Sequence, residues 1–169
     1  MTSIEFAIVS VPLVGMFFAI AETGVMILAQ HALDSAVQDA SRRIMTGEVQ
    51  AGGMSAAQFK ADICSRISGL VNCTGGLYVD VRSYSSAAPA PTKPRIGAYG
   101  SGTFDPSGFG FNPGGPSCIV VVRAALEYPA YVGLFGDALK ELSNGKRIMM
   151  STASFRNEPY VVSGPAPAC

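Results

Sequence analysis

The sequence predicts an α+β fold in which one long N-terminal helix packs against the antiparallel sheet of a head domain. The run from Ile4 to Leu28 is almost entirely apolar. The roughly 120 residues after Gly47 alternate short apolar segments with turn residues, as a globular domain does. Their patterns give the order helix, strand, strand, helix, strand. We therefore expect residues 1–30 to form the apolar half of the first helix. Residues 31–169 should form the head, including the amphipathic half of that helix.

The apolar half is long enough to cross a membrane. Phe6 to Leu28 would cover about 34 Å as an α-helix. So long an apolar helix is hard to bury in one core of a 169-residue chain, which favours a membrane or assembly role over a core helix. No basic segment precedes the run and no small-residue cleavage site closes it, so it does not have the pattern of a secretory signal.

Two carboxylates, Glu5 and Glu22, are the only ionisable side chains of this run. A charge at the edge of a membrane helix is unfavourable by a few kcal/mol unless it is paired, so Glu5 marks a candidate functional site. The nearest candidate partner is an α-amino group, that of Met1 or of a neighbouring chain. Glu22 lies about 100° around the helix from Glu5, so the two are not expected to form one acid–base site.

Pro12 and a row of small residues interrupt the large apolar side chains. Pro12 lacks a backbone donor and crowds the carbonyl four residues before it, which predicts a kink or loosened turn around Ile8 to Pro12. Gly15, Ala19 and Thr23 recur every four residues. Such a row lets another helix approach closely, although small residues are common enough in apolar helices for the row to arise by chance.

The first helix continues beyond the apolar run as an amphipathic helix. Its apolar stripe is Leu33, Ala36, Val37, Ala40 and Ile44. Gly47 supplies a stop, so we expect a helix of about 44 residues. Asp39 and Arg43 have the i,i+4 spacing of an ion pair.

The remaining elements follow from capping and periodicity. Ser55 predicts the cap of a second helix whose apolar face is Phe59, Ile63, Ile67 and Leu70. Leu77, Val79 and Val81 alternate with Tyr78, Asp80 and Arg82, which predicts a strand with one face in water.

Two further strands are predicted in the last third of the chain. CIVVVRAALEY, residues 118–128, is apolar enough for a central strand, and Pro129 should end it. A short helix is expected over Leu134–Leu142. Asn144-Gly145 then turns the chain into a third strand, KRIMMSTASF, residues 146–155.

Four cysteines lie in the head, and their even number suggests two disulfides formed in an oxidising compartment. Of the three pairings, we favour Cys64–Cys73 with Cys118–Cys169. The first would tie a helix end to the next strand, and the second would tie the last residue to a strand. A metal site needs closely spaced ligands, which neither the cysteines nor the single histidine, His31, supply. We expect no metal and no cofactor.

The charges do not indicate a nucleic-acid partner, and the motifs do not indicate an enzyme. The chain has 12 acidic and 12 basic residues, so nothing points to a polyanionic partner. It contains no P-loop, nucleophile elbow or paired catalytic carboxylates. We therefore expect no catalytic residues.

Two segments of the head are candidate contact surfaces. Residues 85–117 are rich in Gly, Pro and Ser and carry four aromatic residues, Tyr99, Phe104, Phe109 and Phe111. These could form an adhesive or subunit-contact surface, but aromatic residues more often hold a long loop on its own domain. Glu158 could bind a basic residue of a neighbour or belong to a turn fixed by Pro159.

The chain resembles type IV pilins, and more closely the TadE-like proteins of the tight-adherence (Tad) pilus system. Glu5 followed by Phe6 matches the start of a mature pilin if Met1 is its first residue. Pro12 and Glu22 match the early proline and second glutamate of TadE-like helices. The helix continuation HALDSAVQDASRRI and the C-terminal RNEPY, residues 156–160, are also similar to that family.

The resemblance implies a pilin-like fold and a structural subunit that forms an extracellular filament. Residues 1–30 would be the transmembrane and later filament-core segment. Its partners would be other copies of the chain, the inner membrane before assembly, a prepilin peptidase and the pilus assembly machinery. Glu5 would face a neighbour's N-terminal ammonium and fix the axial register. The assembly residues would be Met1, Glu5, Phe6, Pro12, Gly15, Ala19 and Glu22. The alternatives are a minor pseudopilin that primes or caps another subunit's pilus, and a single-pass membrane-anchored binding or enzymatic domain.

Overall fold

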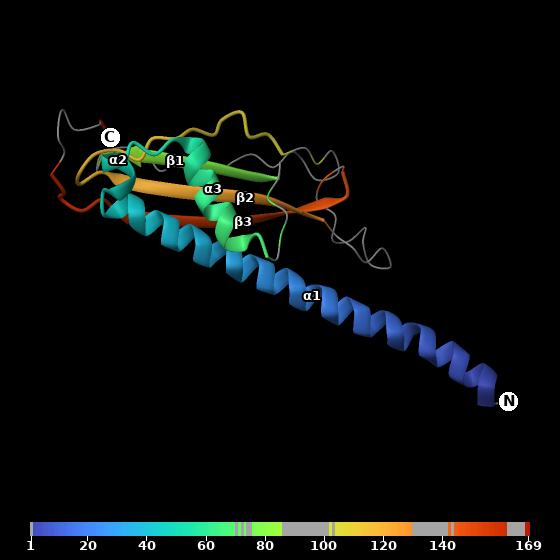
Figure 1. Ribbon diagram of the computed structural model, residues 1–169. Helices are drawn as coiled ribbons and strands as arrows, with labels where there is room; N and C mark the ends of the chain where they lie inside the picture. The colour runs from blue at the N-terminus through green and yellow to red at the C-terminus, as the bar shows by residue number, and fades with distance from the viewer. Residues whose placement is uncertain are drawn as a thin grey trace.

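The computed structural model describes residues 2–69, 71, 73, 76–85, 102, 104–129, 142, 144–161 and 168–169. The elements are α1 (Thr2–Met45), α2 (Glu48–Ala51), α3 (Ala56–Ile67), β1 (Leu77–Tyr84), β2 (Ile119–Pro129) and β3 (Lys146–Arg156). They form the predicted α+β fold, a long apolar helix on an antiparallel sheet (Figure 1). Met1, Leu70, Tyr99 and the helix expected over Leu134–Leu142, apart from Leu142 itself, lie outside the described residues.

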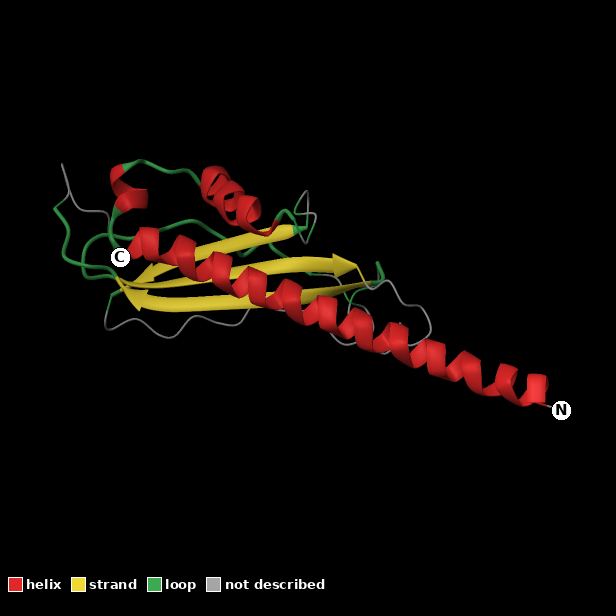
Figure 2. Cartoon of the chain, turned by 60° about the horizontal axis from the view of Figure 1, so that its bottom comes forward, coloured by secondary structure: helices red, strands yellow, loops and turns green. Residues whose placement is uncertain are grey.

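α1 is a single helix of 44 residues, the length predicted, and its first half projects from the head (Figures 1 and 2). The structure does not show the sharp kink expected around Ile8 to Pro12, and the alternative expectation, a loosened turn, stays a prediction. The helix continues through Pro12 and its ribbon shows no sharp bend there. Pro12 removes only one backbone donor, and the turns on both sides keep their own hydrogen bonds.

The sheet has three antiparallel strands in the order β1-β2-β3, so β2 is central as predicted. Val122 of β2 lies opposite Val81 of β1 and Ala153 of β3. β2 begins one residue later than expected, at Ile119, and ends at Pro129. Gly145, in the turn before β3, has a positive φ of 76°, the conformation that the Asn-Gly pair predicts.

The core lies between one face of the sheet, α1 and α3 (Figure 2). The predicted stripe of α1 is buried throughout, and Leu33, Val37 and Ile44 are completely inaccessible to water. On α3 the predicted face is buried at Phe59, Ile63 and Ile67. Ser55 caps α3, and Gln58 completes a capping box that we had not predicted.

Asp39 and Arg43 of α1 pair with residues of α2 and α3 and not with each other. Asp39 and Arg43 were expected to pair along α1, but Asp39 binds Arg66 at 3.0 Å, and Arg43 binds Glu48 and Asp62, each at 3.1 Å. α1 and α3 pack side by side. Charged residues of α3 are therefore closer to Asp39 and Arg43 than these two residues are to each other along α1. These pairs are partly exposed and each contributes little to stability.

The alternation of β1 predicts a second face in water, and this is only partly so, because Arg82 is exposed but Asp80 is not. Asp80 is only 2% exposed. Its carboxylate accepts from the backbone N–H of Gly110 and from Arg82, and it lies 4.0 Å from Arg123. The segment around Gly110 runs beside β1, where Val81 and Phe111 form a parallel bridge, and it covers Asp80.

Candidate functional site

The projecting half of α1 carries large apolar side chains that the head leaves exposed. Their exposure ranges from 47% at Val25 to 75% at Phe6. They are Ile4, Phe6, Ile8, Val9, Val11, Leu13, Val14, Met16, Phe17, Phe18, Ile20, Val25, Ile27 and Leu28. At 100° per residue they occupy every side of the helix, so an apolar environment must surround it.

Burial of these exposed side chains would release a large free energy. Burial of one such side chain stabilises by about 1.5–3 kcal/mol, so the whole set represents on the order of 20 kcal/mol. By length and composition, α1 could cross a membrane, and no residue of its most apolar stretch is buried. The projecting half is therefore a segment that requires lipid or other helices.

The two carboxylates of this half lie in different surroundings. Glu5 is exposed near the tip, whereas Glu22 is half-buried near the head. The 17 residues between them span about 26 Å along the helix. They are thus far apart, and each must be considered separately.

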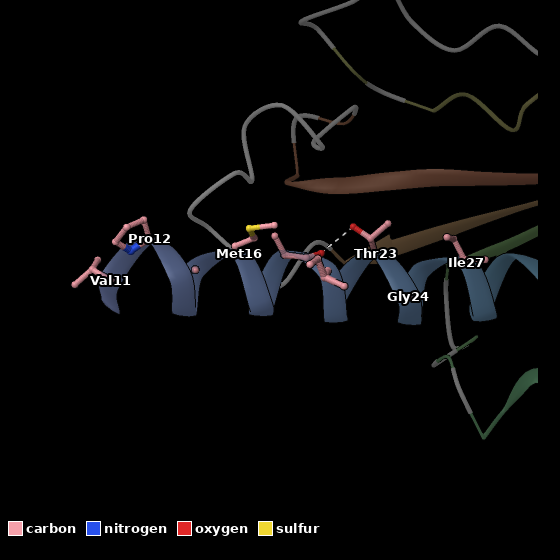
Figure 3. A pocket seen from close by; sticks show the side chains of 9 residues that line it. Val11, Pro12, Met16, Thr23, Gly24 and Ile27 are labelled. Atoms are coloured by element: carbon pink, nitrogen blue, oxygen red, sulfur yellow. Dashed lines mark hydrogen bonds between the residues drawn. The ribbon is translucent and has the colours of Figure 1, made fainter. Parts of the chain in front are cut away.

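A shallow apolar groove runs along one side of the projecting half (Figure 3). It contains Pro12, Gly15, Ala19 and Thr23, the proline and the small row that the sequence singled out. Its other lining residues are Val11, Met16, Ile20, Gly24 and Ile27. The hydroxyl of Thr23 donates to the carbonyl of Ala19 at 2.8 Å, so it is satisfied within the helix. A helix can therefore pack in the groove without leaving this hydroxyl unpaired.

The groove leads into a second hollow, which we call the neck cleft, where α1 meets the sheet. α1 supplies Thr23, Met26, Ile27 and Gln30, and β3 supplies the four residues Arg147 to Met150. Thr23 and Ile27 line both hollows. Nη1 of Arg147 lies 3.4 Å from Sδ of Met26. The amide of Gln30 donates to the Met150 carbonyl and to Asp34, each at 3.1 Å.

Sequence reasoning missed the neck cleft. Its only available signal was the pair of basic residues, Lys146 and Arg147, that opens the third strand. Which end of α1 that strand reaches depends on the tertiary packing. The pair alone therefore does not reveal the cleft.

The described aromatic residues of the 85–117 segment pack on their own head. Phe104 lies 5.1 Å from Tyr78 and 5.6 Å from Phe109, measured between ring centroids. Phe111 lies 5.5 Å from Phe59 of α3. Burial, and then the nearby Glu127 carboxylate, raise the pKa of Tyr78. This packing matches the interpretation that the aromatic residues hold the loop on its domain.

The RNEPY segment closes the far end of α1. The N–H of Glu158 donates to the Met45 carbonyl at 2.9 Å, which satisfies a carbonyl of the last helical turn. The ring of Tyr160 covers Gly47, and its hydroxyl donates to the Gly114 carbonyl. Burial raises the pKa of Tyr160. The side chain of Glu158 remains exposed.

The head contains two disulfides, Cys64–Cys73 and Cys118–Cys169, the pairs that the sequence favoured. Their Cα atoms are 5.8 and 5.6 Å apart. Within the part of the chain that the structure describes, no group of three or more His, Cys, Asp or Glu residues could hold a metal ion. The disulfides indicate that the head matures in an oxidising compartment.

In this chain, one half of a long helix is apolar and exposed, and the other half packs on an antiparallel sheet. This arrangement is that of the pilin-like class of α+β proteins. Within that class, residues 1–42 match the family model of TadE-like proteins. The match extends through most of α1 and confirms the resemblance to that family. Searches against curated proteins and against solved structures gave no match. The fold and this family match fit a Tad pilus-associated subunit, and the length and composition of α1 fit a membrane anchor.

Proposed function

We propose that this protein is a structural subunit that assembles through the projecting half of α1 into an extracellular Tad-type pilus filament. The observation that carries the proposal is the exposure of apolar side chains on every side of residues 4–28. A one-sided stripe would suit a single docking partner. A helix that is apolar all round suits lipid first and a bundle of identical helices afterwards.

The inner membrane would hold the subunit before assembly. In the membrane, acyl chains cover the projecting half and the disulfide-containing head lies outside. In the filament, the same half would pack among its copies. The groove containing Pro12, Gly15 and Ala19 would let a neighbouring helix approach closely, since small residues bring backbones together.

Glu5 would act as the register residue of the filament. Inside a bundle of apolar helices, an unpaired carboxylate is unfavourable by several kcal/mol. A neighbour's N-terminal ammonium, that of Met1, would relieve this penalty only at the correct axial offset. Glu22 would have an assembly role nearer the head, and Phe6 would contribute apolar contact beside Glu5.

The test is assembly of Glu5→Ala compared with Ile4→Ala. Both positions are exposed at the tip, but only Glu5 carries a charge. We expect Glu5→Ala to abolish filaments in the sheared fraction, seen by electron microscopy and immunoblotting, while Ile4→Ala still assembles. Thermal unfolding should show intact heads in both variants. Normal filaments from Glu5→Ala would refute the register role.

The identity of the filament is tested separately. Gold-labelled antibody against the head should decorate the whole length of the filaments. Decoration confined to filament ends would identify a minor pseudopilin. A protein present only in the membrane, in cells that make no filament containing it, would identify a membrane-anchored binding or enzymatic domain.

Processing by a prepilin peptidase has its own measurement. We expect mass spectrometry of the mature protein to give Met1 as the first residue. Deletion of the peptidase should leave a longer precursor and no filament. A mature chain that extends upstream of Met1 would contradict the proposed processing.

A further inference from the structure

We propose that, while α1 is held in a membrane, the neck cleft lies within the bilayer interface on the side of the head and is filled by an acyl chain of a phospholipid. The contact involves the head as well as the helix, because β3 supplies half of the lining residues. The inference rests on the membrane-held state of the proposed function. It adds that the neck end of the head is partly immersed and does not stand clear of the lipid.

The length of the apolar helix sets the level of the membrane surface. A hydrocarbon core of about 30 Å corresponds to roughly 20 helical residues. Glu5 is unfavourable inside that core, so the core should begin near Phe6 and end near Val25. Met26 is the next residue of the helix, and it lines the neck cleft. The cleft therefore lies at the boundary between acyl chains and headgroups.

The headgroup layer brings the start of β3 into the interface. With its headgroups a bilayer is about 40–45 Å thick, which adds roughly 5–7 Å on each side of the core. Gln30 lies about 8 Å beyond Val25 along the helix, at the outer edge of this layer. The side-chain amide of Gln30 donates to the Met150 carbonyl at 3.1 Å. The residues of β3 that line the cleft are therefore at headgroup level.

The lining of the cleft suits hydrocarbon. Its apolar members are Met26, Ile27, Ile148, Met149 and Met150. Methionine adapts its shape to irregular apolar partners, and a flexible acyl chain is such a partner. The cleft continues at Thr23 and Ile27 into the apolar groove of the projecting half. An acyl chain that lies along this groove can thus enter the cleft without crossing water.

The polar side chains around the cleft are already bound within the chain. The Thr23 hydroxyl donates to the Ala19 carbonyl, and the Gln30 amide donates to a carbonyl of β3. Glu22 and Arg147 also interact within the chain. None of these side chains has to give up a partner to admit an acyl chain. The apolar stem of Arg147 can lie along the cleft while its guanidinium keeps its present contacts.

The size of the cleft favours an acyl chain over a neighbouring helix. A helix with its side chains is about 10–12 Å wide. The cleft has a volume of only about 280 Å³, which admits a slim chain but not a whole helix. Phospholipid is also present wherever α1 is anchored, so this occupant requires no further partner.

Quenching of a fluorescent label by nitroxide-bearing phospholipids tests the contact. The full-length protein is reconstituted into phosphatidylcholine vesicles, and a single added cysteine takes the label, because the four native cysteines are in disulfides. The test variant is Met150→Cys on the head. Ile27→Cys reports lipid around α1, and Ser154→Cys, exposed and further along β3, is the control. With the nitroxide near the top of the acyl chain, we expect roughly twofold quenching at residues 27 and 150 and little at residue 154.

The outcomes separate the inference from the proposed function. Quenching at residue 27 but not at residue 150 would overturn the inference and leave the anchoring of α1 intact. Equal quenching at residues 150 and 154 would also overturn it, because the sheet as a whole would then lie on the lipid. Absence of quenching at residue 27 would contradict the membrane-held state itself, and both proposals would fail.

A second labelled position guards against damage to the head. Asn144→Cys lies in an exposed turn at the start of β3, and we expect it to be quenched like residue 150. Thermal unfolding shows whether each labelled head is intact. A label at residue 150 that aqueous iodide cannot reach, although lipid nitroxides leave it bright, would assign the cleft to a second copy and overturn the inference.

Discussion

The two halves of α1 have the same secondary structure but opposite surroundings. From Leu33 onward the apolar residues form one stripe that the head buries, whereas up to Leu28 the large apolar residues apart from Met26 occupy every side and remain exposed. The helix itself is continuous across the junction. The difference shows that the head packs on only one face of the second half of α1. The other half is built for contacts with lipid or other chains, and the neck cleft lies where the two meet.

The comparison is tested most strongly by removing one leucine from each half. Leu33 is fully buried and Leu28 is 59% exposed. We expect Leu33→Ala to lower the free energy of unfolding by about 2–5 kcal/mol, because it leaves a cavity in the core. Leu28→Ala should change it by no more than about 0.5 kcal/mol. Urea unfolding in detergent, followed by tyrosine emission, measures both, since the chain has no tryptophan. Equal losses would contradict the division.

The disulfides test whether the head is stabilised independently of the projecting half. We expect removal of either bridge, by paired Cys→Ser changes, to lower the free energy of unfolding by about 2–4 kcal/mol. The loss should be greater for Cys118–Cys169, whose cysteines are 51 residues apart, than for Cys64–Cys73, which are 9 apart. The longer loop restricts the unfolded chain more. The reverse order in urea unfolding would show that local packing outweighs loop length.

The end of α1 provides a smaller test. Gly47 has φ of 80°, and a β-carbon there would lie 2.5 Å from the Tyr160 ring. We expect Gly47→Ala to lower the free energy of unfolding by about 1–3 kcal/mol through strain and collision. Gly53→Ala is the matched control, because Gly53 also has a positive φ but has open space around it. Equal effects, measured by urea unfolding, would show that the contact with Tyr160 is unimportant.

The smallest expected effect concerns pH. Burial raises the pKa of Tyr160 above its ordinary value of 10.0. The folded state therefore holds this proton more tightly than the unfolded state does. The resulting stability is complete below pH 10 and is lost as the pH rises through the folded-state pKa. Tyr160→Phe should weaken this alkaline loss in thermal unfolding between pH 9 and about 11, leaving the part due to Tyr78. An unchanged alkaline profile would contradict the role of Tyr160.

Local sequence signals predicted much of the fold. The apolar stripe through Leu33 and Ile44 identified the packed half of α1, Gly47 marked its end, and the apolar continuity before Pro129 identified the central strand. These signals depend on neighbours within a few residues. They sufficed because periodicity and turn chemistry act over the same range.

The failures involve contacts between distant segments. Asp80 alternates like a solvent-facing residue, but a segment some 30 residues later covers it. Arg147 lies 121 residues from Met26, so no local pattern could place it at the neck of α1. Arg43 pairs with Glu48 of α2 and Asp62 of α3, and a local pattern does not predict contacts between helices. Tertiary packing decided each case.

Electron cryomicroscopy of filaments purified from cells that make the protein tests the central claim most directly. The account predicts residues 4–28 of neighbouring copies bundled in the filament core, with the disulfide-containing heads outside. A filament built without this chain, or a chain whose projecting half remains in lipid, would contradict it.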